Sequence, residues 1–318
     1  MKPLIMAPLR GFTDAVFRNA FQSHFQGIDE AIAPFLTSIK GRRIKPSHLV
    51  DLAPEANMGL PVVPQILSNH ADEFICLANT LVDLGYSEIN WNLGCPYPMV
   101  AKKLRGSGLL PRPDLIDSML GAVLNRFTGK LSIKTRLGRH SADEMKSLIP
   151  VFNRYPLARV IVHPRTGVQM YDGAADLETF AECLTAICHP VVYNGDIRNV
   201  AMFHKVEARF PDVSGWMIGR GLLANPFLAE NLTQGCCLAN DRAKSRFAAF
   251  HGSLVDAYRH RFSGPAHVLD RMKGLWRYFR YGFVDGPRIL KRVRKAGSLE
   301  QYQRVTDEAL TGDVQWFA

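Results

Sequence analysis

The chain alternates between short apolar runs rich in β-branched residues and longer segments with helical spacing. The short runs occupy residues 3–8, 30–35, 61–67, 87–93, 131–137, 158–164, 190–195 and 214–220. Between them, residues 71–85 have a helical period that ends at Gly85, and residues 112–127 have the same period. Eight strands alternating with helices predict an α/β fold in which a parallel sheet closes as a (β/α)₈ TIM barrel. A doubly wound open sheet is the alternative.

The pattern changes in the last quarter of the chain. From about residue 241 it is helical only, as in residues 242–262 and 267–283, and no strand pattern returns. Residues 37–59 form a poor helix pattern, and we expect them to be partly loop. The sequence therefore predicts a barrel domain over residues 1–240 and an all-helical domain over residues 241–318.

Charge separates the same two parts. The chain has a net charge of +10, and residues 241–305 carry 15 Lys and Arg against 5 Asp and Glu, so the rest of the chain sums to zero. A neutral body with a basic helical part indicates that one part handles a small molecule and the other meets a polyanion such as nucleic acid. A solvated basic helix face is the alternative.

Composition excludes several classes of protein. No apolar run reaches the roughly 18 residues of a membrane span, and the amino-terminal segment lacks a signal-peptide cleavage pattern. The six cysteines show neither a disulfide framework nor a C-x-x-C pair. We expect a cytoplasmic protein with reduced thiols and no metal site, acting as a monomer and not on a membrane.

Polar side chains lie at the carboxyl ends of six consecutive predicted strands, which is the catalytic face of a barrel. They are Gln65, Asn92 with Cys95, Lys134 with Arg136, His163 with Arg165, Asn194 with Asp196, and Arg220. Each residue has an ordinary structural explanation when taken alone. Polar residues at the same end of six consecutive strands, however, indicate a ligand-binding or catalytic site. Glycines in "YNGDI" and "MIGRGLLANP" would let backbone N–H groups approach a phosphate. No dinucleotide fingerprint or Walker A sequence is present, so the phosphate is expected to belong to a mononucleotide cofactor or a phosphorylated substrate.

Several blocks along the chain resemble the tRNA-dihydrouridine synthase (Dus) family. They are "MAPLRGFTDAVFR" (6–18), "PQIL" (64–67), "NLGCP" (92–96), "SIKTRLG" (132–138), "VHPRTGVQMYDG" (162–173), "YNGDI" (193–197) and "MIGRGLLANPFL" (217–228). They occur in the order of the family and cover roughly residues 3–230. The resemblance implies an FMN-dependent enzyme that uses NADPH to reduce the C5=C6 bond of a uridine in tRNA.

The resemblance also assigns residues to the cofactor. It implies that the backbone of Pro8, Leu9 and Arg10 lies along the flavin and that Gln65 bonds the polar edge of its ring. Lys134 matches a lysine at the edge of the ring, where its charge would stabilise the reduced flavin. His163 matches a histidine near the flavin. Contacts to the ribityl chain and phosphate are implied for Asn194, Gly195, Asp196, Gly219 and Arg220.

Cys95 has the central role in this interpretation. It is held on a turn between Gly94 and Pro96, directly after a predicted strand. Reduction of uracil needs a hydride at C6 and a proton at C5, and a thiol at the barrel mouth can supply that proton as a general acid. A thiol with a near-normal pKa of roughly 8.5 suits the role, because it must be protonated when it acts.

The remaining predicted residues belong to the RNA. Asn92 and Arg165 are assigned to the substrate, and a basic surface is expected from Lys102, Lys103 and Arg105 on the barrel with Arg277 and Arg280 on the helical part. In residues 271–283 we expect the apolar positions Leu275, Trp276, Phe279 and Phe283 to face a core and the arginines to face RNA.

Leu9 and Arg10 depart from the residues usual in the family, and Arg10 could serve either the flavin or the substrate path. Two alternatives to the tRNA enzyme are a small-molecule flavoenzyme of the dihydroorotate dehydrogenase type and a catalytically silent RNA-binding barrel. Neither the position of the target uridine nor the choice of structured RNA follows from the sequence.

Overall fold

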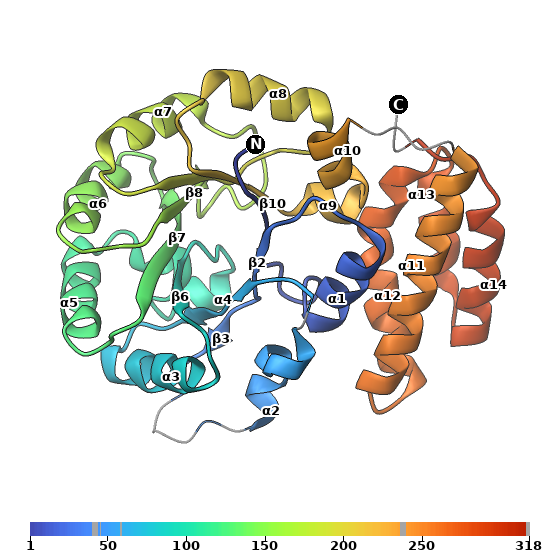
Figure 1. Cartoon of the computed structure of the whole chain (residues 1–318), viewed down its shortest axis with the longest axis horizontal. Coiled ribbons are helices and arrows are strands. Elements are labelled where there is room, and N and C mark those ends of the chain that lie inside the picture. Colours follow the sequence, from blue (N-terminus) through green and yellow to red (C-terminus); the bar gives the residue numbers. More distant parts are fainter. Residues whose placement is uncertain (40–43, 45, 58, 236–239, 316–318) are drawn as a thin grey trace.

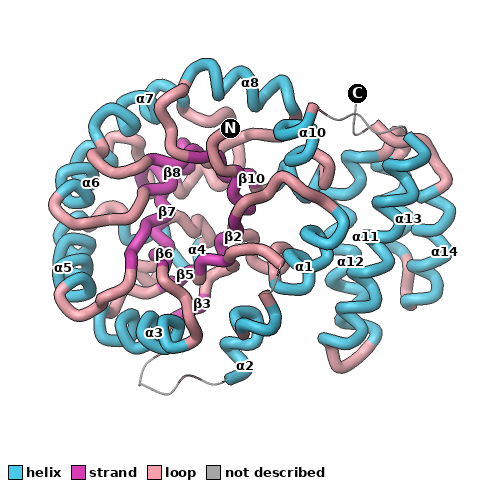
Figure 2. The backbone as a smooth tube through the Cα atoms, viewed as in Figure 1, coloured by secondary structure: helices cyan, strands magenta, loops and turns pink. Residues whose placement is uncertain are grey.

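A computed structural model of the chain describes residues 1–39, 44, 46–57, 59–235 and 240–315. Its centre is one parallel sheet of ten short strands, surrounded by helices (Figures 1 and 2). The strands are β1 (Leu4–Met6), β2 (Glu30–Ile32), β3 (Leu36–Thr37), β4 (Val62–Val63), β5 (Gln65–Leu67), β6 (Glu88–Leu93), β7 (Lys130–Gly138), β8 (Val160–Thr166), β9 (Val191–Tyr193) and β10 (Gly215–Ile218).

The ten strands form a closed barrel of eight, because two predicted strands are each interrupted. The order is β3-β5-β6-β7-β8-β9-β10-β1-β2-β4, in which β2 pairs with β4 and β3 pairs with β5. Thus β2 with β3 forms the second barrel strand, and β4 with β5 forms the third. Pro34 and Pro64 fall within the interruptions, where a missing N–H breaks the ladder. All eight predicted strands and the TIM barrel are confirmed, and the open-sheet alternative is wrong.

Successive side chains of a strand point alternately into the barrel and toward the helices, so the protein has an inner and an outer hydrophobic core. Ile5 and Ala7 of the first strand point to the inside of the barrel, whereas Leu4 and Met6 pack against the helices. The inner cluster contains Ile5, Ala7, Ile32, Val63, Ile161, Val192 and Met217. A barrel filled in this way is solid, so its ligand site has to lie at one end.

Helices cover the outside of the barrel. They are α1 (Ala15–His24), α3 (Ala71–Asp83), α5 (Pro113–Leu124), α6 (Glu144–Asn153), α7 (Leu177–Ala186), α8 (Val200–Arg209) and α10 (Leu228–Gln234). Shorter pieces are α2 (Pro46–Leu49), α4 (Pro98–Ala101), α9 (Arg220–Ala224) and the 3₁₀ turns η1 (Val50–Leu52), η2 (Pro54–Ala56) and η3 (Gly106–Leu109). Side chains of Asp14, Asp176 and Asn199 cap the first turns of α1, α7 and α8. The helix predicted over residues 71–85 is confirmed; Gly85 follows its end with φ +98°.

The carboxyl-terminal part is helical, as predicted. It contains α11 (Asn240–Arg261), α12 (Pro265–Phe279), η4 (Arg280–Gly282), α13 (Gly286–Lys295) and α14 (Leu299–Leu310). These helices form a layer beside the barrel, with α11 against α1 (Figure 1). As expected, Leu275, Trp276, Phe279 and Phe283 are buried.

Aromatic and ionic contacts join the two parts. Phe250 of α11 makes edge-to-face contacts with Phe17, Phe21 and Phe25, at centroid distances of 5.8, 6.5 and 5.0 Å. Arg271 of α12 pairs with Asp14 at 3.2 Å. One hydrophobic cluster runs through both parts, so the helices sit in a fixed position relative to the barrel mouth. The boundary predicted between residues 240 and 241 falls at the start of α11, and an independent fold for each domain stays a prediction.

Candidate active site at the carboxyl end of the barrel

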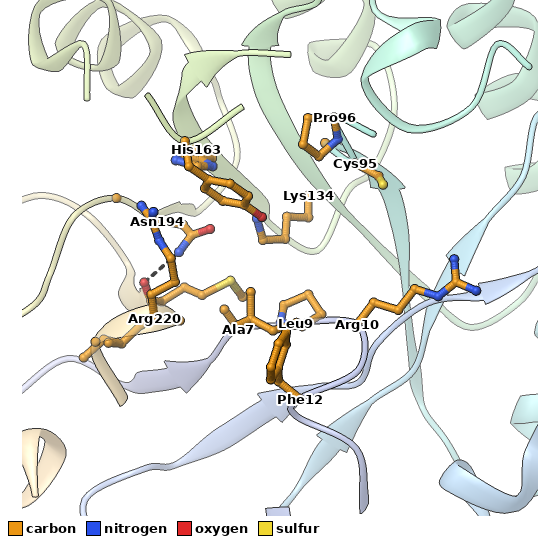
Figure 3. Close-up of a pocket in the computed structure, with 18 of the residues that line it drawn as sticks. Ala7, Leu9, Arg10, Phe12, Cys95, Pro96, Lys134, His163, Asn194 and Arg220 are labelled. Atoms are coloured by element: carbon orange, nitrogen blue, oxygen red, sulfur yellow. Dashed lines mark hydrogen bonds between the residues drawn. The ribbon is translucent and has the colours of Figure 1, made fainter. Parts of the chain in front are cut away.

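The carboxyl ends of the strands surround an open pocket with about 1090 Å³ of space, part of which is open solvent. Of the predicted site residues, those that line it are Pro8, Leu9, Arg10, Asn92, Cys95, Lys134, His163, Asn194, Gly195, Asp196, Gly219 and Arg220. They come from segments far apart in the sequence and meet at the same end of the barrel because parallel strands all finish there (Figure 3).

Asn92, near the end of β6, builds the turn that carries Cys95. Its side-chain oxygen accepts hydrogen bonds from the backbone N–H of Cys95 at 2.8 Å and of Gly94 at 3.1 Å. Its amide group donates to the oxygen of Gln65 at 2.7 Å, and Gln65 donates to Asn90 at 2.7 Å. Each of these buried amides thus restrains the next. Because Asn92 holds the Cys95 turn, this hydrogen-bonded chain from β5 and β6 fixes the position of the thiol.

A second segment packs on the other side of Cys95. The backbone N–H and hydroxyl of Ser107 each donate to the Cys95 carbonyl at 3.0 Å. Gly106 lies so close that a Cβ there would stand 2.8 Å from the Cβ of Cys95, and its φ of +57° also favours glycine. Arg139 donates to the Pro96 carbonyl at 3.0 Å. The thiol therefore sits between two rigid segments.

Burial governs the protonation of Cys95. It raises the pKa of the Cys95 thiol above its ordinary value, although the Tyr97 N–H and the charges of Arg136, Arg10 and Lys134 oppose the shift. The thiol is therefore protonated at neutral pH. This is the state that a general acid needs, and a reactive thiolate would be in the opposite state.

Lys134 and Arg136 project from β7 with different surroundings. Arg136 is tied to the protein, because it donates to the carbonyls of Gly94 at 3.0 Å and Thr166 at 2.8 Å. Lys134 has no hydrogen-bond or ion-pair partner among the residues that the structure describes, and it lines the pocket (Figure 3). Burial, together with the charge of Arg136, lowers the pKa of Lys134 to about 7. An unpaired, desolvated ammonium group is ready to accept an anionic ligand.

His163 of β8 is neutral and has a defined tautomer. Burial and the neighbouring charges of Arg136, Lys134, Arg165 and Arg220 lower the pKa of His163 well below its ordinary value. Arg165 donates to Nε2 of His163 at 3.1 Å. Since an arginine can only donate, Nε2 accepts and the proton lies on Nδ1. His163 can thus offer one N–H donor without adding a charge.

The other end of the pocket is formed after β9 and β10. Asn194 donates to the Met217 carbonyl at 2.9 Å, and Asp196 lies 3.4 Å from both Arg198 and Arg220. A Cβ at Gly195 would come within 2.7 Å of the buried Tyr193 hydroxyl, so only glycine fits there. Although burial alone would raise the pKa of the Asp196 carboxyl, the hydrogen bond and charge of Arg165 hold it below its usual range.

The charge of the pocket is strongly positive. Its described lining contains five cationic side chains and one carboxylate, that of Asp196; the cations are Arg10, Lys134, Arg136, Arg198 and Arg220. Such a surface favours an anionic ligand. No cluster of three or more His, Cys, Asp or Glu within the described parts of the chain is arranged to hold a metal ion.

Some predicted residues lie outside this pocket. Gln65 and Arg165 are fully buried and serve neighbouring groups; Arg165 bonds Asp196, His163 and the carbonyls of residues 172 and 173. Lys102, Lys103 and Arg277 are exposed. Arg105 is held by Asn69 at 3.0 Å and Glu73 at 3.8 Å, and Arg280 donates to the Tyr281 hydroxyl at 2.7 Å.

Several lining residues were not predicted. Tyr171 lies in the recognised block 162–173, and its ring faces Arg220 at 4.5 Å and Arg136 at 5.3 Å. Tyr278 comes from α12 and meets Phe12 edge-to-face at 5.1 Å. The helical part therefore contributes directly to the pocket. A recognised motif contained Tyr171, whereas only tertiary packing could reveal Tyr278; Arg136, a predicted strand-end residue, also lines the pocket.

Comparison with known proteins agrees with this geometry. The sequence model of the family described as Dihydrouridine synthase (Dus) matches residues 5–301. The chain belongs to the dihydrouridine synthase family. The match covers both the barrel and most of the helical part, so the family is shown for nearly the whole chain.

Individual relatives of the Dus family carry related names. The chain is 30% identical over 240 residues to tRNA-dihydrouridine synthase B of Yersinia pestis, covering 72% of this chain and 70% of that protein. It is 26% identical to tRNA-dihydrouridine(16) synthase of Neisseria meningitidis serogroup B, covering 73% and 71%. It is 29% identical to a Rhodobacter capsulatus protein named "Probable tRNA-dihydrouridine synthase", covering 71% and 69%. Relatives with different names thus match at similar identity. The comparison therefore defines the family but not which position of a tRNA is modified.

Among the described residues, no helix is long and apolar enough to cross a membrane.

Proposed function

We propose that this Dus protein reduces the C5=C6 bond of a uridine in tRNA to 5,6-dihydrouridine, with FMN as bound cofactor and NADPH as electron donor. The observation that carries the proposal is the pocket itself, in which a protonated thiol and an unpaired ammonium group line the same cationic cavity. Membership of the Dus family supplies the reaction class.

The residues present suit FMN. Lys134 offers an unpaired cation for the anionic edge of the reduced ring. The phosphate would be held by Arg220 and by the backbone around Gly195 and Gly219, where side chains are absent. Asn194 and Asp196 would hold the ribityl chain, and the backbone of residues 8–10 would flank the ring. The chemistry that bound FMN supplies is delivery of a hydride to C6 of the uracil ring.

The protein supplies the second hydrogen. Cys95 is the general acid that gives its proton to C5, and its buried thiol is protonated at neutral pH. Asn92 holds the Cys95 turn through the two hydrogen bonds to its side-chain oxygen. His163 offers its Nδ1–H to the cofactor and remains uncharged. Gln65 acts behind this layer by fixing Asn92.

The RNA must present its uridine outside the base stack, because the pocket lies within the barrel end. Lys102, Lys103 and Arg277 are exposed cations suited to phosphate contacts, and Arg105 and Arg280 are held near the same surfaces. Such contacts position the RNA and carry little sequence information. We expect the protein to act on tRNA as a cytoplasmic monomer.

Visible spectroscopy and one assay test the proposal. The purified protein, supplemented with FMN, should show flavin absorbance, lose it on anaerobic addition of NADPH, and regain it on addition of transcribed tRNA. A colourless protein after FMN addition would support a silent RNA-binding barrel. Reoxidation by free orotate or uracil and not by tRNA would support the small-molecule flavoenzyme, which leaves the basic helical part without a role.

A further inference from the structure

Arg10 has an unusual position for a cation at the pocket. It follows β1, is exposed, and lies with its guanidinium carbon 5.4 Å from the centre of the Phe35 ring. No hydrogen bond or ion pair joins it to any residue that the structure describes. The aromatic ring therefore holds its orientation, while all its N–H donors remain open to a ligand.

Arg10 faces the side of the pocket where Cys95 lies. In Figure 3 its side chain extends away from Arg220 and toward the side of Cys95. Its charge acts to lower the pKa of the Cys95 thiol, whereas the cations that act on His163 are Arg136, Lys134, Arg165 and Arg220. Of the two roles that the sequence left open, this geometry favours the substrate path over the phosphate end of the cofactor site.

A second cavity adjoins the first at this point. It is open, with about 910 Å³ of space that includes solvent at its mouth, and it shares Arg10 and Phe35 with the main pocket. Leu36 and Leu77 give it apolar walls, and the exposed Thr37 also lines it. Its carboxylate, Glu73, accepts from Ser38 at 2.8 Å and lies 3.8 Å from Arg105, so its charge is already compensated.

We propose that this second cavity binds the nucleotide next to the target uridine and that Arg10 binds the phosphate between the two. In RNA, adjacent nucleosides are joined by one phosphate. A free, forked cation on the wall between two neighbouring cavities is placed to pair with that phosphate. The inference rests on the proposed function and adds to it a binding site for a flanking nucleotide.

Three variants test the site. Arg10→Gln removes the charge, and Thr37→Trp fills the second cavity without changing charge. Lys130→Gln is the matched control, because Lys130 begins β7 at the opposite end of the barrel and is exposed. For each, we would measure bound FMN, the rate of flavin reduction by NADPH without RNA, and the KM for transcribed tRNA at several salt concentrations.

The expected result is a loss confined to the RNA step. Arg10→Gln should raise the KM for tRNA about 10-fold, consistent with the loss of one charge-assisted hydrogen bond. The slope of log KM against log salt concentration should become smaller by about 0.7, because one phosphate is no longer neutralised. Thr37→Trp should raise the KM with an unchanged slope. Both should keep wild-type FMN content and flavin reduction, and Lys130→Gln should match wild type throughout.

Two results would overturn the inference and leave the proposed function intact. In one, Arg10→Gln loses FMN or slows flavin reduction, which would place Arg10 at the cofactor. In the other, Arg10→Gln or Thr37→Trp reduces tRNA with the wild-type KM. Failure of the wild-type protein, loaded with FMN, to reduce any tRNA would overturn both proposals and is recognised by the wild-type assay alone.

Discussion

Asn92 and Cys95 are linked by a hydrogen bond of 2.8 Å from the backbone N–H of Cys95 to the side-chain oxygen of Asn92. The same oxygen accepts from Gly94, and the Asn92 amide is in turn held by Gln65. A strand residue thereby fixes the loop that carries the proposed acid. The position of the thiol is consequently a property of the barrel and not of the loop alone.

Loss of the Asn92 side chain, which accepts the hydrogen bonds of the Cys95 turn, should impair the reduction of uridine more than the reduction of the flavin. In Asn92→Ala the buried N–H of Cys95 and the half-buried N–H of Gly94 lose their acceptor, so we expect the free energy of unfolding to fall by about 1–3 kcal/mol and uridine reduction to fall with it. Flavin reduction by NADPH should persist. Asn92→Asp keeps an acceptor oxygen and should retain more activity than the alanine variant. Equal dihydrouridine formation by wild type and Asn92→Ala would show that the hydrogen bonds from the Cys95 turn to Asn92 are dispensable.

Close packing at Gly106 gives an independent test of how Cys95 is held. Gly106→Ala would set a Cβ 2.8 Å from the Cys95 Cβ, in addition to the strain of a φ of +57°. Gly235→Ala is matched in backbone strain, with φ +62°, but its Cβ would meet no atom of the described residues within 4 Å. We expect both to lower the melting temperature, and only Gly106→Ala to impair tRNA reduction at a temperature where both are folded. Equal impairment by both would indicate backbone strain as the cause.

Lys134 should make cofactor binding dependent on pH. Its pKa of about 7 in the ligand-free protein leaves it mostly neutral at pH 8. An anionic ligand stabilises the charged form, so FMN binding should raise this pKa and take up a proton from solution at pH 8. The uptake should shrink at pH 6, where Lys134 is already charged. Calorimetry in buffers of different ionisation enthalpy measures it, and Lys134→Met should abolish the uptake and weaken FMN binding.

The barrel could be predicted from the sequence because strands and helices alternate with clear periods. The residues at its mouth followed from topology, since parallel strands end at one face. Pro34 and Pro64 split two strands without disturbing the order. The pattern could not decide which polar strand-end residues face the pocket. Gln65 begins β5, in the last part of the third barrel strand, and Arg165 is next to last in β8, yet neighbouring protein groups use their donors.

Residues that reach the site by packing could not be predicted. Tyr278 belongs to α12, more than a hundred residues beyond the strand that carries His163, and it reaches the pocket because α11 and α12 pack on α1 and α9. Phe35 ends the predicted run 30–35 and lies in the interruption between β2 and β3, and only packing places its ring beside Arg10. The positions of Tyr278 and Phe35 both depend on contacts between segments whose proximity in space is not evident from the sequence.

The basic helical part should control RNA affinity and not flavin chemistry. Arg277 is exposed on α12, one residue before Tyr278 of the pocket. Arg277→Glu should weaken tRNA binding and reduce the slope of log affinity against log salt by roughly 0.7–0.9 for each phosphate that the protein no longer neutralises. Lys130→Glu, at the far end of the barrel, is the control for net charge. Equal affinities and slopes for these two variants would assign RNA binding to the barrel rim around Lys102 and Lys103.

The proposal that Cys95 is the acid of a uridine reductase is tested by converting uridine to dihydrouridine in transcribed tRNA and measuring the digested nucleosides by mass spectrometry. With FMN and NADPH, the wild-type protein should produce dihydrouridine, and the rate should fall as pH rises through the raised pKa of Cys95, because only the protonated thiol is active. Cys95→Ala should bind FMN and oxidise NADPH normally but form dihydrouridine about 10²- to 10⁴-fold more slowly. Dihydrouridine formation by Cys95→Ala at the wild-type rate would show that the proton comes from another group, and none by the flavin-loaded wild type would show that the protein does not reduce uridine in tRNA.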